Sequence, residues 1–189
     1  MRAPRTLIFG GARSGKSAHA EQLAADSGKP VIYVATAAVG DAEMAARIDL
    51  HRKQRQQHRH WQTVEEGLTL GAVIARHSRA DNLLLVDCLT VWLSNLLFCA
   101  PQDYPEIGRI APPARFATER EAFLQALARA PGEIVLVSNE VGMGIVPMGA
   151  VSRWFVDEAG RLNQAVAACC ERVQWVAAGL PLHLKGAPC

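Results

Sequence analysis

The stretch TLIFGGARSGKS, residues 6–17, determines the fold of this 189-residue chain. Its first four residues form a short apolar run that predicts a buried strand, and residues 17–27 predict a helix that ends at Gly28. Between them, residues 10–17 match the pattern G-x-x-x-x-G-K-S, a phosphate-binding loop in the strand–loop–helix context that the pattern requires. Four specified positions coincide by chance in fewer than roughly one chain in a hundred, so a plain glycine turn is a poor alternative.

The residue types in this loop suit a nucleoside triphosphate. Glycines let main-chain N–H groups turn toward a phosphate, and the positive end of the following helix points at the same place. Lys16 is expected to neutralise β- and γ-phosphate oxygens, and the Ser17 hydroxyl to ligate Mg²⁺. Asp87, which follows the apolar run 83–86, is the expected carboxylate on the Mg²⁺ side. The predicted phosphate-binding residues are Gly10, Gly11, Ala12, Arg13, Ser14, Gly15, Lys16 and Ser17.

Beyond the loop, short apolar runs alternate with amphipathic segments. We predict strands at 31–35, 83–86, 134–137 and 173–177, and helices at 41–58, 68–77, 90–98, 114–130 and 152–170. Continuous apolar strands are typical of a sheet covered on both faces, and their alternation with helices favours parallel pairing. The sequence therefore predicts an α/β, P-loop NTPase-like three-layer fold with a mostly parallel central sheet. We expect one catalytic domain over residues 1–189, with ligands at the carboxyl ends of the strands.

Composition excludes several classes of protein. Half of the residues are apolar and a fifth are charged, which is ordinary for a globular chain. The net charge of +2 is too balanced for a protein whose main partner is nucleic acid or an anionic membrane. No signal-peptide core precedes the loop, and polar residues such as Asp87 interrupt the longest apolar run, so we expect no membrane span. The five cysteines include no C-x-x-C pair, which indicates reduced thiols in a cytoplasmic protein.

Residues 47–60 are rich in Arg, Lys and His and contain a single acid. On a helix, Arg47, His51 and Arg55 would share one face. A solvated surface is the ordinary explanation of such a run, and contact with nucleic acid is a second. A third is a triphosphate clamp, in which guanidinium groups grip phosphate oxygens and disfavour protonated histidine. A neutral imidazole could then attack an α-phosphorus and expel pyrophosphate. Spacing alone leaves these three alternatives open.

Eight blocks of sequence follow one another along the chain. They are GGARSGKS (10–17), YVAT (33–36), DAEMAARI (41–48), HWQTVE (60–65), DCLT (87–90), SNLL (94–97), SNEVGMGIVP (138–147) and RWFVDEAGRLNQ (153–164). In this order they resemble the bifunctional adenosylcobinamide kinase/adenosylcobinamide-phosphate guanylyltransferase family of cobalamin biosynthesis. The resemblance covers nearly the whole chain except the proline-rich stretch 99–113, and the block at 138–147 is its most specific part.

The resemblance implies two reactions. A nucleoside triphosphate phosphorylates the hydroxyl of the aminopropanol arm of adenosylcobinamide. GTP then transfers GMP to that phosphate through a guanylyl-histidine, which gives adenosylcobinamide-GDP and pyrophosphate. The guanylylated histidine falls on His51. Nucleotide contacts carry over to the loop 10–17 and to Thr36, Ala37, Ala38, Arg52, Lys53, Gln54, Arg55, Glu65 and Asp87. Asp87 stands where some relatives have glutamate, a carboxylate with a longer reach.

Asn139 and Glu140 follow a predicted strand on the ligand edge and are candidate substrate-binding residues, although a tight turn explains these residue types equally well. The expected cofactor is Mg²⁺, with GTP and ATP as substrates, and similar proteins form homo-oligomers, trimers among them. Two other functions stay open beside the bifunctional enzyme. One is a P-loop kinase of a small metabolite, in which His51 only binds phosphate. The other is a non-catalytic nucleotide-binding module, which no partner-binding segment of the sequence supports.

Overall fold

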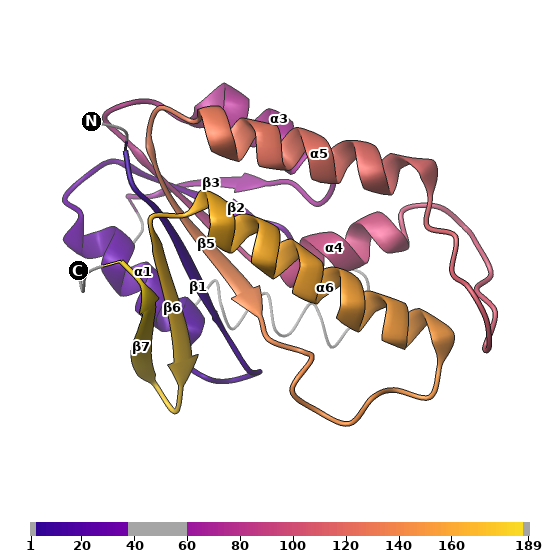
Figure 1. Ribbon diagram of the computed structural model, residues 1–189. Coiled ribbons are helices and arrows are strands. Elements are labelled where there is room, and N and C mark those ends of the chain that lie inside the picture. Colours follow the sequence, from indigo (N-terminus) through magenta and orange to yellow (C-terminus); the bar gives the residue numbers. More distant parts are fainter. Residues whose placement is uncertain (1–2, 38–59, 187–189) are drawn as a thin grey trace.

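A central sheet carries helices on both of its faces (Figure 1). The computed structural model describes residues 3–37 and 60–186. The strands are β1 (Arg5–Gly10), β2 (Val31–Ala35), β3 (Gln62–Glu65), β4 (Leu83–Asp87), β5 (Glu133–Asn139), β6 (Arg172–Ala177) and β7 (Leu180–Lys185). The helices are α1 (Lys16–Asp26), α3 (Leu70–His77), α4 (Leu89–Leu97), α5 (Ala114–Arg129) and α6 (Ala150–Cys169). The strand order is β3-β2-β4-β5-β1-β6-β7, and only the pair β6–β7 is antiparallel.

Strands β1, β2, β4, β5 and β6 lie where continuous apolar runs predict them. The described helices begin and end within two residues of the predicted positions. Gly28, the predicted helix end, follows α1 with a φ of +66°, in the left-handed region that favours glycine. The α/β, mostly parallel, three-layer architecture is therefore confirmed. The helix predicted over 41–58 lies outside the described residues.

Two strands, β3 and β7, were not expected from the sequence. Both are edge strands in the described sheet, so they need no continuous apolar run. In β3, Val64 is half-buried and its three neighbours in the strand are exposed. In β7, Leu180, Leu182 and Leu184 are all more than half exposed. A tight turn at residues 178 and 179 follows β6 and leads into the antiparallel strand β7.

The two faces of the sheet bury different layers. On one face, Leu84, Val86 and Leu136 pack in the same cluster as residues of α3, α4, α5 and α6. On the other, Leu85 and Val137 pack in a cluster with residues of α1. Alternation along each strand makes both clusters possible, and each fully buried Leu or Val contributes roughly 1.5–3 kcal/mol to folding.

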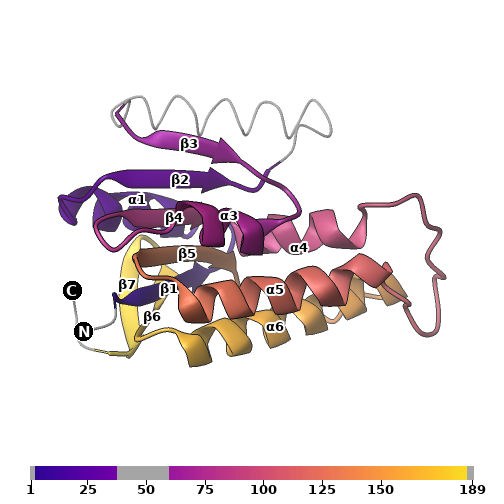
Figure 2. The ribbon, with the colours of Figure 1, turned by 90° about the horizontal axis from the view of Figure 1, so that it is seen from above.

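Helix α4 and the beginning of α6 extend beyond the carboxyl ends of the strands, as Figure 2 shows. Helix α4 follows β4 almost directly, and α6 begins after the ten-residue connection 140–149 from β5. The carboxyl edge of the sheet is therefore flanked by two helices and one long loop. None of the described helices combines the length and apolar character needed to cross a bilayer.

A buried arginine ties β1 to the end of α5. Arg5 has no exposed surface, and its Nε donates to the carbonyl of Leu127 at 2.6 Å. Its Nη2 donates to the carbonyls of Ala128 and Ala130 at 3.3 and 3.2 Å, and Nη1 lies 3.5 Å from a Glu171 carboxylate oxygen. The last carbonyls of a helix lack partners within the helix and carry its negative dipole end. Arg5 thus satisfies the end of α5 with a cation.

We expect Arg5→Met to lower the free energy of unfolding by roughly 3 kcal/mol, because buried carbonyls lose a charged donor. Chemical denaturation measures the change. Arg129→Met is the matched control, since Arg129 is exposed in the last turn of the same helix and should cost less than about 1 kcal/mol. Equal losses in the two variants would contradict the role of Arg5.

Candidate functional site

The phosphate loop lies between β1 and α1, in the context that the sequence predicts. A Cβ at Gly10 would lie 2.3 Å from the main-chain oxygen of Val176, so a larger residue at this position would displace β6. Gly15 has a φ of +93°, a conformation that favours glycine. The turn after β6 supports the loop from outside, because the Gly179 N–H donates to the carbonyl of Ser14 at 2.8 Å. Backbone packing on β6 therefore fixes the shape of the loop.

The Lys16 side chain folds back toward the beginning of the phosphate loop. Its side chain is largely buried, and Nζ donates to the carbonyl oxygen of Gly11 at 3.0 Å. The ammonium group is thus held above the main-chain groups that would surround a phosphate. This position suits the predicted role of Lys16 as a cation for phosphate oxygens.

Asp87 lies at the carboxyl end of β4, on the same edge of the sheet as the loop. The order β4-β5-β1 puts it two strand positions from β1, which is about 10 Å at the usual strand spacing. The buried Tyr33 hydroxyl donates to Asp87 Oδ2 at 3.1 Å and orients the carboxylate. Sequence reasoning gave Tyr33 no role, because this hydrogen bond joins residues that are 54 positions apart.

The Ser17 hydroxyl and the Asp87 carboxylate, the two predicted ligands of a divalent cation, both lie within the described residues. No group of three or more His, Cys, Asp or Glu residues within 3–37 and 60–186 is arranged to bind a metal ion. Mg²⁺ needs no such cage, since it binds through one or two protein oxygens together with phosphate oxygens and water. The oxygen donors of Ser17 and Asp87 fit that pattern.

Thr36 and Cys88 join the ends of β2 and β4. The Thr36 hydroxyl accepts from the Cys88 N–H and donates to the Cys88 carbonyl, both at 2.8 Å. The Thr36 carbonyl accepts from Asn95 Nδ2 at 2.7 Å. Sequence reasoning assigned no role to Asn95, which anchors α4 to this edge. The direct nucleotide contacts of Thr36 and Ala37 remain predictions.

The Cys88 thiol is not a candidate nucleophile. Burial, followed by the neighbouring Asp87 carboxylate, raises the pKa of this thiol to about 12. The thiolate is the reactive form of cysteine, and at neutral pH almost none is present at such a pKa. Cys88 therefore acts through its main chain.

Asn139 and Glu140 are brought directly to the phosphate loop. The Glu140 N–H donates to the carbonyl of Gly10 at 2.9 Å, and the Asn139 N–H donates to Thr90 Oγ1 at 2.7 Å. Asn163 of α6 donates from Nδ2 to the carbonyl of Asn139 at 3.1 Å, a positioning contact that sequence reasoning did not identify. These bonds give the 138–147 block a fixed start beside the candidate nucleotide site.

Glu65 lies at the other end of the carboxyl edge. It ends β3, which is four strand positions from β1 and so roughly 19 Å away. The next residue, Glu66, holds the turn before α3 by accepting from the N–H groups of Leu68 and Thr69 at 2.7 and 2.8 Å. Burial alone would raise the pKa of Glu66, but these hydrogen bonds outweigh it and lower the pKa below its usual value. The nucleotide role of Glu65 stays a prediction.

Six predicted site residues lie outside the described part of the chain. They are Ala38, His51, Arg52, Lys53, Gln54 and Arg55. In sequence they belong to the connection between the carboxyl end of β2 and the beginning of β3. Their roles rest on the sequence alone.

Comparisons with known proteins find one family model and several relatives that match nearly the whole chain. The family model described as cobinamide kinase / cobinamide phosphate guanyltransferase matches residues 6–184. The bifunctional adenosylcobalamin biosynthesis protein CobP of Pseudomonas aeruginosa PAO1 is 54% identical over 184 residues, which cover 97% of this chain and 99% of that protein. The bifunctional adenosylcobalamin biosynthesis protein CobU of Escherichia coli K12 is 42% identical, over 95% of this chain and 98% of that one.

Similarity to solved structures extends to the fold alone. A solved protein of Pyrococcus horikoshii OT3 superposes with a TM-score of 0.57 and covers 100% of this chain and 89% of its own. Its sequence identity is 8%. Such a likeness supports the α/β architecture and says nothing about substrates.

We expect Tyr33→Phe and Asp87→Ala to be energetically coupled, because the phenol donates to the carboxylate in a mostly buried setting. A double-mutant cycle on the free energy of unfolding should give a coupling of about 1–2 kcal/mol. Phenylalanine keeps the ring that packs against β4, so the cycle isolates the hydroxyl. Additive effects, within experimental error, would show that the hydrogen bond does not hold Asp87.

Proposed function

The chain belongs to the cobinamide kinase / cobinamide phosphate guanyltransferase family, and we propose that it carries out two successive reactions on adenosylcobinamide. The first phosphorylates the hydroxyl of the aminopropanol arm, and the second converts the phosphate to adenosylcobinamide-GDP. The observation that carries the proposal is the shared sheet edge on which the phosphate loop, Lys16, Asp87 and the 138–147 block meet. This edge lies within a chain that the family model matches almost from end to end.

In the kinase step, the substrate hydroxyl oxygen forms a bond to the γ-phosphorus of a nucleoside triphosphate. The bond between that phosphorus and the β–γ bridging oxygen breaks, a nucleoside diphosphate leaves, and the hydroxyl proton passes to a base. Main-chain N–H groups of residues 10–17 hold the phosphates, and Lys16 offsets the charge that develops on the transferring group. Mg²⁺, held by Ser17 and Asp87, would supply further charge neutralisation.

In the guanylyl transfer, the neutral imidazole of His51 attacks the α-phosphorus of GTP. Pyrophosphate leaves, and a guanylyl-histidine with a phosphorus–nitrogen bond remains. A phosphate oxygen of the phosphorylated substrate then attacks the same phosphorus and releases the imidazole. Arg52 and Arg55 are suited to grip phosphate oxygens, and their positive charge disfavours protonation of the histidine. These roles follow from the resemblance and the residue types.

We expect α-labelled GTP to leave a label on the protein that is lost in acid and retained in base, as a phosphoramidate should be. His51→Ala should abolish it. His58→Ala is the matched control from the same segment and should retain the label. Label that persists in His51→Ala would place the nucleophile elsewhere. A wild-type chain that phosphorylates adenosylcobinamide but takes no label would instead identify a kinase without nucleotidyl transfer.

We expect Lys16→Ala to reduce the phosphorylation rate of adenosylcobinamide by about 10²–10³-fold at saturating nucleotide, because the transferring phosphoryl group loses a cation. A coupled or chromatographic assay of the product measures the rate. Lys29→Ala serves as control, since Lys29 precedes β2 at the amino ends of the strands, away from the phosphate loop, and pairs with Glu133. Unchanged turnover in Lys16→Ala would reject the assignment.

A further inference from the structure

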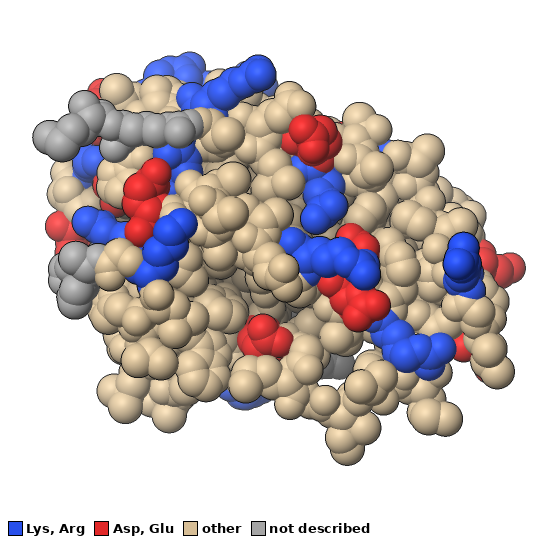
Figure 3. All heavy atoms as spheres, viewed as in Figure 1, with Lys and Arg blue, Asp and Glu red and all other residues tan. Residues whose placement is uncertain are grey.

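The loop between β5 and α6 presents large apolar side chains to water. Met143, Ile145, Val146 and Met148 are 77, 98, 72 and 91% exposed. In the space-filling view the lower margin of the molecule, where this loop runs in Figure 1, is mostly free of charged atoms (Figure 3). Grouped exposed apolar residues mark binding surfaces more often than chance, because leaving them in water is unfavourable.

The loop is fastened at both ends. Its first residue, Glu140, donates its N–H to Gly10 of the phosphate loop at 2.9 Å, and its carboxylate accepts from the Gly142 N–H at 2.6 Å. At the other end, Arg153 donates to the carbonyls of Pro147 and Met148. The apolar residues thus lie on a segment that hydrogen bonds hold at both ends. The fold itself therefore keeps these side chains exposed.

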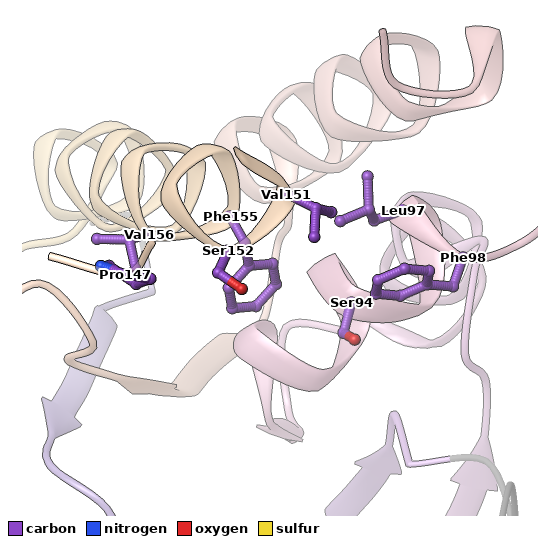
Figure 4. A pocket seen from close by; sticks show the side chains of 8 residues that line it. All are labelled: Ser94, Leu97, Phe98, Pro147, Val151, Ser152, Phe155 and Val156. Carbon is purple, nitrogen blue, oxygen red and sulfur yellow. The ribbon is translucent and has the colours of Figure 1, made fainter. Parts of the chain in front are cut away.

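Beside the loop, a cavity of about 280 Å³ separates α4 from the beginning of α6 (Figure 4). Leu97 at the end of α4 and the next residue, Phe98, line one side, Val151 and Phe155 line it from α6, and Pro147 comes from the loop. The figure shows Val151 and Leu97 pointing toward one another across the groove. The polar side chains among its lining residues are two serines, and none of these residues is charged. Such a lining does not suit a triphosphate.

The groove belongs to the carboxyl edge and adjoins the nucleotide side. Helix α4 reaches that side through Asn95, which donates to the carbonyl of Thr36, and through Thr90, which accepts from the Asn139 N–H. Pro147 follows Glu140 by seven residues, so it lies at most about 25 Å from the phosphate loop along a fully extended chain. The groove and the phosphate loop are thus joined by one ten-residue segment, which begins at the Gly10 contact and includes Pro147 of the groove.

We propose that the groove between α4 and α6, together with loop 140–149, binds the corrin macrocycle of the substrate, an inference that rests on the proposed function. A corrin is a broad, largely apolar ring with carboxamides at its rim. Apolar side chains suit the ring, and the hydroxyls of Ser94 and Ser152 suit the carboxamides. The macrocycle is larger than the cavity, so one edge of the ring enters the groove and Ile145, Val146 and Met148 cover the rest. The aminopropanol arm then extends along Glu140 to the phosphate loop.

The test fills the groove and, separately, removes the apolar cover. Ser152→Trp places a large ring in the groove from an exposed helical position, and Ile145→Ser changes a side chain that contributes little to folding. Asp157→Trp is the control for the first variant, because Asp157 is exposed on the same helix and does not line the groove. Leu184→Ser, an exposed leucine at the far end of β7, is the control for the second. The measurements are the Kd and KM of adenosylcobinamide, the Kd of GTP, and the molecular mass by light scattering.

We expect Ser152→Trp to raise the Kd and KM of adenosylcobinamide by at least about tenfold and Ile145→Ser by a few fold, with GTP affinity and molecular mass unchanged. If the wild-type protein phosphorylates adenosylcobinamide and both variants bind adenosylcobinamide with unchanged affinity, the groove is not the corrin site. The proposed function would then stand. A fall in molecular mass would also overturn the corrin site, because the groove would then be an interface between copies of the chain. A wild-type chain that phosphorylates no adenosylcobinamide would overturn the proposed function and, with it, this inference.

Discussion

The close packing of the phosphate loop between the ends of β5 and β6 is the constraint on which the site depends. On the β6 side, the Val176 carbonyl leaves no room for a side chain at position 10, and the turn at Gly179 supports Ser14. On the β5 side, Glu140 donates to Gly10. Main-chain contacts thus fix the position of the phosphate loop relative to the sheet. Because loop 140–149 starts from the same contact, its position follows from that of the phosphate site.

The carboxyl edge divides into parts of different chemistry. The part near β1 offers main-chain N–H groups, a lysine and hydroxyls, with the Asp87 carboxylate oriented by Tyr33. The part between α4 and α6 is apolar. Helix α4 separates the two and is tied to the polar part by Asn95 and Thr90. In the proposed function, the polar part binds the nucleotide and the apolar part binds the ring of the substrate, so both substrates lie on a single edge.

The G-x-x-x-x-G-K-S pattern located the phosphate loop, and the apolar pattern of the sequence was enough to locate five strands and the described helices. These elements are buried on two faces or one, so hydrophobicity alone marks them. Strands β3 and β7 were missed because edge strands are exposed and carry no such run. The contacts of Tyr33, Asn95 and Asn163 were missed for another reason. Each joins segments that meet only after strands β2, β4 and β5 have paired, and nothing in the local sequence signals the partner.

Strand β7 has a consequence for how the chain behaves in concentrated solution. It ends the described sheet and carries three exposed leucines, and an extended segment of another molecule could add to this strand by backbone pairing. Two residues of the strand oppose such growth. Pro181 has no N–H group that could pair with an incoming strand, and Lys185 places a positive charge at the last residue of β7. The six residues of β7 that form the exposed edge strand thus also include two residues that disfavour fibrillar self-association.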